Sequence, residues 1–155
     1  MLYTVKICIP SDLSHDEIEK CVSIVCDGGA VDRAKATRNI PRACALAVVR
    51  NGNIIVGFGA IKRLQRGHTA DVSKRSGYPL DPLTPEVGYM AVLPTHRRKG
   101  LSRQILTALI GQHPGLLFAT TDDIAMKKTL AGAKFVRKGD EWPGNRGKLS
   151  LWVRR

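Results

Sequence analysis

The sequence is short of acidic residues and lacks any pattern that would hold a metal ion or cross a membrane. Only 13 Asp and Glu stand against 25 Lys and Arg. The four cysteines form no C-x-x-C pair and have no histidine at zinc-ligand spacing, so we expect no metal site. No apolar run approaches the roughly 18 residues of a membrane helix, and the N-terminus has no signal-peptide pattern. We therefore expect a soluble cytoplasmic protein with reduced cysteines.

The surplus of basic residues gives the chain a formal net charge of +12. Such a surplus favours a polyanionic partner, such as nucleic acid, the ribosome, an acidic protein or the phosphates of a cofactor. A basic surface that only keeps the protein in solution explains the charge equally well. The length of 155 residues and the hydrophobic content of 43% predict one globular domain over residues 1–155. Whether two copies form a homodimer is left open.

Apolar periodicity predicts an α/β protein. A capping box at residues 14–17 opens a helix that ends at Gly28-Gly29, and residues 30–42 are compatible with a short helix before Pro41. Two more helices are predicted at 101–111 and from the cap at 121–123 to residue 133. Strands are predicted at 3–9, 44–49, 54–61, 86–93, 116–119, 134–137 and 149–153, with a hairpin at Asn51-Gly52 and a loop at 139–147. The passage 86–133 should supply the parallel part of a mixed sheet.

Residues 64–85 break this pattern and are predicted to form a long polar loop with prolines at 79, 82 and 85. A structureless connection of about twenty residues in a compact domain is usually functional. His68 and Tyr78 lie in it and are candidates to meet a substrate. The alternatives are a mobile insertion and side chains that merely fill the surface.

The most informative segment is 86–106. A predicted buried strand is followed by Pro94, by a basic turn at Arg97–Gly100 and at once by a helix. The first N–H groups of a helix and its dipole attract an anion, and three cations in the turn suit a ligand with several phosphates. Glu86 begins the same strand and is a candidate base. The alternative interpretation is that Glu86 is a structural carboxylate paired with an arginine.

These residues resemble the GNAT superfamily of acyl-CoA-dependent N-acyltransferases. The family's pyrophosphate loop, Arg/Gln-x-x-Gly-x-Gly/Ala, is matched by the run Arg97–Ser102, with Ser in the last place. A second passage of the family, Asp-Asn followed by an apolar helix and Gly-Phe, is similar to Asp122-Asp123 through Phe135. Two departures concern mechanism. Asp123 stands where the family often has Asn, and Leu130 stands where many members have a Tyr that protonates the leaving thiolate.

The resemblance implies a GNAT-like fold, in which helices flank a mixed central sheet that splays at the cofactor cleft. It implies acetyl-CoA as acyl donor and Glu86 as the base that deprotonates the attacking amine. A backbone N–H of the strand would polarise the thioester carbonyl, the basic turn would hold the pyrophosphate, and Asp123 would contact the pantetheine arm. The cofactor-binding residues so implied are Met90, Ala91, Val92, Arg97, Arg98, Lys99, Gly100, Leu101, Ser102 and Asp123.

We therefore expect an N-acetyltransferase acting on a primary amine. The basic charge favours an acceptor on a protein, an aminoacyl-tRNA or another polyanion-associated molecule. A small-molecule amine is the second substrate class. The alternative from a different functional class is a catalytically inactive protein with this fold that binds nucleic acid or a protein partner.

Overall fold

The computed structural model describes residues 2–29 and 31–155, and its N-terminal elements follow the sequence pattern. Strand β1 (Tyr3–Cys8) leads into helix α1 (His15–Asp27). The predicted capping box is confirmed: the Ser14 hydroxyl accepts the Glu17 N–H at 3.2 Å, and the Glu17 carboxylate accepts the Ser14 N–H at 3.0 Å. This pairing satisfies two N–H groups that the first turn of a helix would otherwise leave without partners.

A short helix and a hairpin come next. Helix α2 (Arg33–Asn39) forms within the stretch 30–42, of which residue 30 lies outside the described residues. Strands β2 (Ala45–Asn51) and β3 (Ile54–Ile61) are antiparallel and meet at the predicted turn, where Asn51 pairs with Ile54. The hairpin prediction is therefore confirmed.

The chain forms two units, which we name by their segments. The first unit comprises Met1–Arg63 and Val87–Pro114, and the second comprises Leu64–Glu86 and Gly115–Arg155. Each has its own β-sheet and its own buried core. None of the helices in the described part of the chain is long and apolar enough to cross a membrane.

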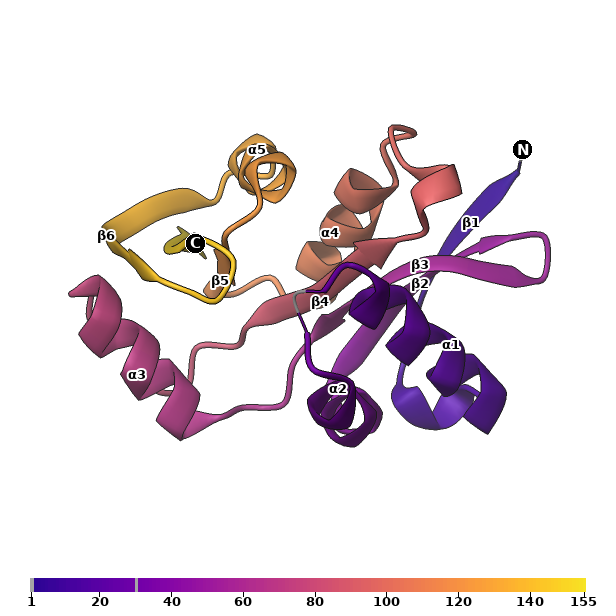
Figure 1. Ribbon diagram of the computed structural model, residues 1–155, viewed down its shortest axis with the longest axis horizontal. Helices are drawn as coiled ribbons and strands as arrows, with labels where there is room; N and C mark the ends of the chain where they lie inside the picture. Colours follow the sequence, from indigo (N-terminus) through magenta and orange to yellow (C-terminus); the bar gives the residue numbers. More distant parts are fainter. Residues whose placement is uncertain (1, 30) are drawn as a thin grey trace. The chain divides into compact units, whose positions relative to one another are not determined.

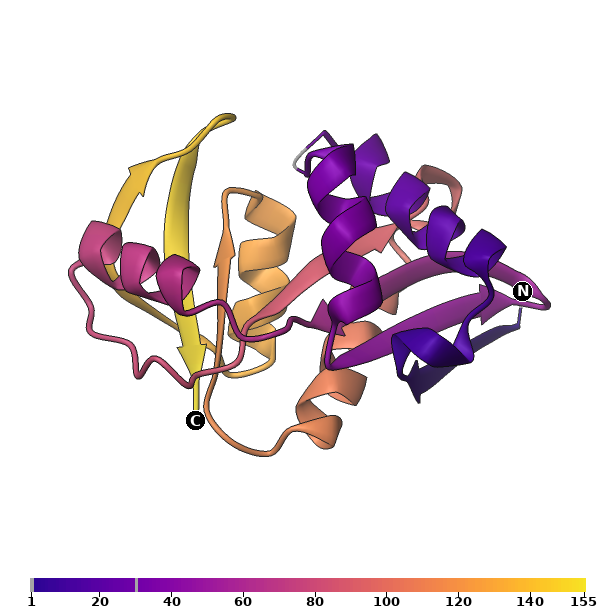
Figure 2. The ribbon, with the colours of Figure 1, turned by 90° about the horizontal axis from the view of Figure 1, so that it is seen from below.

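The first unit is a four-stranded sheet in the order β1-β2-β3-β4, with β4 spanning Val87–Val92. Helices α1 and α2 cover one face, and helix α4 (Leu101–Gln112) covers the other (Figure 2). The strands alternate accordingly: Phe58 packs among α1 residues, whereas its neighbour Gly59 faces Ile105 of α4. This packing fixes the end of β4 and the start of α4 in one framework.

The second unit is a three-stranded antiparallel sheet in the order β5-β7-β6. Figure 1 labels β5, β6 and helix α5 of this unit. Its elements are β5 (Leu117–Thr121), α5 (Ile124–Gly132), β6 (Val136–Pro143) and β7 (Lys148–Arg154). The core of this unit joins Phe118, Trp142 and Leu151 with Val72, which comes from the segment before β4. Residues far apart in the sequence thus share one core.

The prediction of a structureless loop at 64–85 is wrong, because Arg66–Ser76 forms helix α3. Its polar sequence hides the helix, since only Thr69, Val72 and Ser76 are buried. An Arg75–Asp71 ion pair one turn apart, at 3.0 Å, supports it, and Gly77 ends it with a positive φ of 72°. The prolines at 79, 82 and 85 all follow the helix.

Two further predictions need correction. The loop expected at 139–147 is shorter, because β6 continues to Pro143 through an irregularity between Lys138 and Trp142. Parallel pairing was expected along the strands at 86–93 and 116–119. Among the described residues it is confined to one bridge, Glu86 with Phe118, and from Val87 onward β4 pairs with β3, antiparallel.

Candidate active site

Glu86 is a buried carboxylate with a defined neighbour. Only 8% of the residue is exposed, and its backbone forms the parallel bridge to Phe118. The adjacent Pro85 carbonyl accepts the Phe118 N–H at 3.0 Å, which fixes this point of the chain against β5. The His68 Nε2 atom of α3 lies 3.3 Å from Glu86 Oε1 and 3.4 Å from Oε2. A buried carboxylate with an imidazole beside it can accept a proton from a substrate.

Strand β4 is irregular at the residues for which the family resemblance implies an oxyanion donor. Phe58 pairs with Ala91 and Ala60 with Gly88, so Gly59 alone stands opposite Tyr89 and Met90. Tyr89 has a positive φ of 55°, a strained conformation for an aromatic residue. A bulge of this kind turns backbone groups out of the sheet ladder. Of the candidate residues, Met90 lies in the bulge, and Ala91 and Val92 follow it.

The basic turn after β4 is tightly constrained. Arg97, Arg98 and Lys99 are exposed, and the Arg97 Nε–H donates to the Val92 carbonyl at 3.1 Å. Arg98 has a φ of 61° and Gly100 a φ of 75°, so the chain reverses sharply before α4 begins at Leu101. Glycine at the second position makes this conformation inexpensive. The turn therefore holds three cationic residues against the start of a helix.

The first N–H groups of α4 point out of the helix. Gln104 donates to the Gly100 carbonyl at 3.2 Å, so the N–H groups of Leu101, Ser102 and Arg103 precede the first helical hydrogen bond. The Leu101 side chain is buried and anchors the helix, while Ser102 is half-buried. The arrangement offers backbone donors and positive charge at one place, as an anion requires.

Asp123 lies in the second unit and has a local structural partner. Its carboxylate accepts the Met126 N–H at 3.0 Å, so it is the N-cap of α5. The preceding Asp122 receives two hydrogen bonds from Arg146, at 2.8 and 3.2 Å. These bonds raise the pKa of the Arg146 guanidinium. Both acidic residues of the motif are therefore engaged in holding the second unit.

His96, Leu130 and Trp142 have defined surroundings in the structure. His96 Nδ1 is 2.8 Å from the Tyr3 hydroxyl, and the two rings meet edge to face. Leu130 is buried at 1% exposure, so it belongs to the core. Trp142 is buried in the core of the second unit. Sequence reasoning missed the contact between His68 and Glu86, because it depends on the helix that was taken for a loop.

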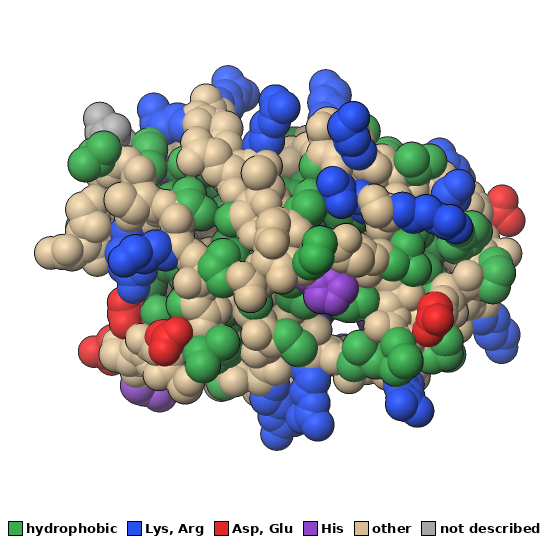
Figure 3. Space-filling view, turned by 180° about the vertical axis from the view of Figure 1, so that it is seen from behind, with side chains coloured by type: hydrophobic (Ala, Val, Ile, Leu, Met, Phe, Trp, Pro, Cys, Tyr) green, Lys and Arg blue, Asp and Glu red, His purple; other side chains and the backbone are tan. Residues whose placement is uncertain are grey.

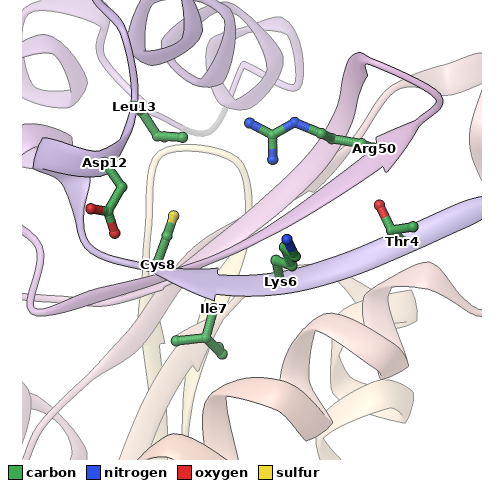
Figure 4. Close-up of a pocket in the computed structure, with 7 residues that line it drawn as sticks. All are labelled: Thr4, Lys6, Ile7, Cys8, Asp12, Leu13 and Arg50. Carbon is green, nitrogen blue, oxygen red and sulfur yellow. The ribbon is translucent and has the colours of Figure 1, made fainter.

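A hollow of about 460 Å³ in the first unit is formed by other residues (Figure 4). Cys8, Asp12 and Arg50 point into it, whereas Ile7 points away. Arg50 forms an ion pair with Glu17 of α1 at 2.5 Å. Burial, followed by the charge of Asp12, raises the pKa of the Cys8 thiol, which makes it a poor nucleophile. Among the described residues, no cluster of three or more His, Cys, Asp or Glu is arranged to hold a metal ion.

The comparisons with known proteins concern the family and the fold. Residues 16–126 match the model of the acetyltransferase (GNAT) family. A search of curated proteins finds no match. A GNAT-family acetyltransferase of Streptococcus agalactiae has a TM-score of 0.73 at 14% identity, with 97% of this chain and 94% of that one covered.

Two further structures were solved with bound molecules. Salmonella typhimurium yncA, with its cofactor acetyl-CoA, has a TM-score of 0.67 at 15% identity and covers 100% of this chain and 94% of its own. Diaminobutyrate acetyltransferase EctA of Paenibacillus lautus, with L-2,4-diaminobutyric acid and coenzyme A, has a TM-score of 0.62 at 15% identity, covering 98% and 93%. At these identities the likeness establishes the fold, and it confirms the predicted GNAT-like α/β class.

The fold and the basic turn before α4 define an acetyltransferase scaffold. The family match spans well over half of the sequence, and the chain belongs to the acetyltransferase (GNAT) family. Members of this family use acetyl-CoA as acyl donor, so the predicted donor is confirmed with the family.

Proposed function

We propose that this protein is an N-acetyltransferase that moves the acetyl group of acetyl-CoA to a primary amine, with Glu86 as the base. The observation that carries the proposal is the buried Glu86, fixed at the entry of β4 in a chain of this family. An amine is protonated near neutral pH and is then no nucleophile. A carboxylate that removes this proton makes the nitrogen lone pair available for attack.

The donor half of the site is formed by the basic turn and β4. We assign the pyrophosphate to the N–H groups of Arg98–Ser102 and to the cations Arg97, Arg98 and Lys99. Cations at a helix N-terminus oppose the helix dipole, and a bound anion offsets that cost. A backbone N–H of Met90–Val92, next to the bulge at Tyr89, is assigned to the thioester carbonyl oxygen.

Asp123 and Leu130 depart from the residues that are common in the family. Asp123 stays a prediction as a contact of the pantetheine arm, since its carboxylate already caps α5. Leu130 cannot donate a proton, so we assign protonation of the departing thiolate to water. The CoA thiolate is a good leaving group, which makes a dedicated acid dispensable.

We place the amine on a macromolecule or on another polyanion-associated acceptor. Arg33, Lys35 and Arg38 of α2 and the following Arg42 are all exposed, and the sequence between Asp32 and Asp71 contains no acidic residue. Lys and Arg side chains also outnumber acidic ones on the face drawn in Figure 3. Such a surface supports a phosphate-bearing or acidic acceptor. The four cysteines are free thiols, in keeping with a reducing cytoplasm.

The test is the Glu86→Gln variant, which keeps the shape of the side chain and removes the base. We expect turnover to fall about 100-fold or more, because general-base catalysis typically contributes that much. The acetyl-CoA affinity, measured by calorimetry, should not change. The control is Glu19→Gln, the same substitution at a half-exposed residue of α1. This variant should have the turnover of the unmodified protein.

Equal turnover by Glu86→Gln and the unmodified protein would remove Glu86 from the mechanism. If the protein binds acetyl-CoA but does not turn it over with any amine, peptide or RNA-linked acceptor, the result favours the alternative of a binding protein without catalytic activity.

A further inference from the structure

His68 lies on the side of α3 that turns toward the core of the second unit. It is one helical turn before Val72, and residues four apart share a helix face. Val72 is 2% exposed and packs in the core. The neighbouring Thr69 is also buried, and its hydroxyl donates to the Gln65 carbonyl at 3.2 Å. The backbone that presents His68 is therefore held by buried residues of the same helix.

The same core also fixes Glu86. Phe118, which is 1% exposed, packs in one cluster with Val72. The Phe118 backbone forms the parallel bridge to Glu86 and donates to the Pro85 carbonyl. Both the imidazole and the carboxylate are thus attached to backbone that rests on one core. Their meeting is set by the fold of this unit and not by two mobile surface chains.

The contact joins a buried acid to a partly exposed imidazole. The Glu86 side chain is 9% exposed and the His68 side chain 39%. The two distances from Nε2 to the carboxylate oxygens, 3.3 and 3.4 Å, are nearly equal. An Nε2–H that faces both oxygens restrains rotation of the carboxylate about its last bond. Burial strengthens this restraint, because water competes less for the carboxylate.

We propose that His68 is a positioning residue for Glu86. This inference rests on the function proposed above, in which Glu86 is the base. His68 donates its Nε2–H to the carboxylate and holds one oxygen in the direction of the incoming amine. The segment 64–85 therefore takes part in catalysis through α3, although no residue of the helix needs to touch the reacting atoms.

Removing the imidazole should lower kcat and leave the KM for acetyl-CoA unchanged. We expect about a tenfold loss of kcat in His68→Ala, the size associated with one hydrogen bond to a charged group. His68→Gln retains an N–H donor of similar reach and should recover most of that loss. Lys74→Ala, an exposed residue of the same helix, should behave like the unmodified protein and controls for damage to α3.

A double-mutant cycle separates this inference from the proposed function. If His68 acts through Glu86, His68→Ala should not slow Glu86→Gln further. An equal tenfold loss in both backgrounds would overturn the inference, as would a His68→Gln variant as slow as His68→Ala. If Glu86→Gln is slow but His68→Ala is normal, the inference fails and the base remains. If Glu86→Gln is itself fully active, the proposed base fails and the positioning residue with it. Thermal melting of every variant confirms that it is folded.

Discussion

Burial of Cys21 in α1 should make the stability of the protein depend on pH. The residue is fully buried, and burial, followed by the nearby Cys8, raises the pKa of its thiol from 9.0 to about 12. The unfolded chain therefore loses this proton at a lower pH than the folded chain. Below pH 9 both states keep the proton and the stabilisation is complete. As the pH rises from 9 toward 12, the free energy of unfolding should fall.

The expected loss from this one residue is about 1.4 kcal/mol between pH 8 and pH 10. Urea unfolding at the two pH values measures it. In Cys21→Ala the free energy of unfolding should change less between the two pH values, by that amount, whatever the absolute stability of the variant. Cys44→Ala, which removes an exposed thiol, should keep the pH dependence of the unmodified protein. An unchanged pH dependence in Cys21→Ala would contradict the assignment.

The position of Glu86 could be predicted from sequence, because a strand start and a following motif fix its place by counting. The contact with His68 could not. It joins residues eighteen apart through a helix whose apolar positions are few, so no periodicity points to it. The hydrogen bond of Arg97 to the Val92 carbonyl is also invisible in the sequence, since Arg97 was counted among the phosphate cations.

At the level of elements, the contact between α3 and β6 depends on Gly139. Its φ is 70°, and a Cβ added there would overlap the carbonyl oxygen of Ser76 at the end of α3. Gly139→Ala should therefore destabilise the protein by about 1–3 kcal/mol. Gly132→Ala, at an open position in α5, is the matched control and should be neutral or stabilising. If the urea midpoints of the two variants shift by the same amount, the contact between α3 and β6 does not depend on Gly139.

Elements with strong apolar periodicity or turn chemistry were predictable: α1 from its capping box, and β2 and β3 from Asn51-Gly52. Helix α3 was missed because its stability comes from a few buried residues, a Gly77 cap and tertiary packing. The extent of β6 was missed for a related reason. Gly139 looked like the start of a loop, but it serves as an irregularity within a strand.

For the whole molecule, the net charge of +12 predicts how an acceptor binds. With a nucleic-acid-linked acceptor, KM should rise by an order of magnitude or more between roughly 50 and 200 mM salt, as a few phosphate contacts require. The variant Arg33→Ala/Arg38→Ala should show a weaker salt dependence. The same measurement with a free small amine of similar reactivity is the control, because it reports how salt affects acetyl-CoA binding alone. A flat dependence for both acceptors would favour a small-molecule amine.

The sequence as a whole was sufficient to predict the family and its acyl donor, because a strand, a basic turn and a helix start follow one another in 86–106. The acceptor half lies beyond that reasoning. Helices α2 and α3 show the difficulty, because both are short or weakly patterned in sequence. Their chemistry becomes readable only when the fold places them.

The most direct measurement is the release of free CoA thiol from acetyl-CoA, followed with a thiol-reactive dye, in the presence of amine, peptide and aminoacyl-RNA acceptors. The account predicts release that requires both the protein and an amine-bearing acceptor, with acetyl recovered on that amine. If acetyl-CoA binds, as a raised melting temperature would show, and no acceptor promotes thiol release, the account of this chain as an N-acetyltransferase is contradicted.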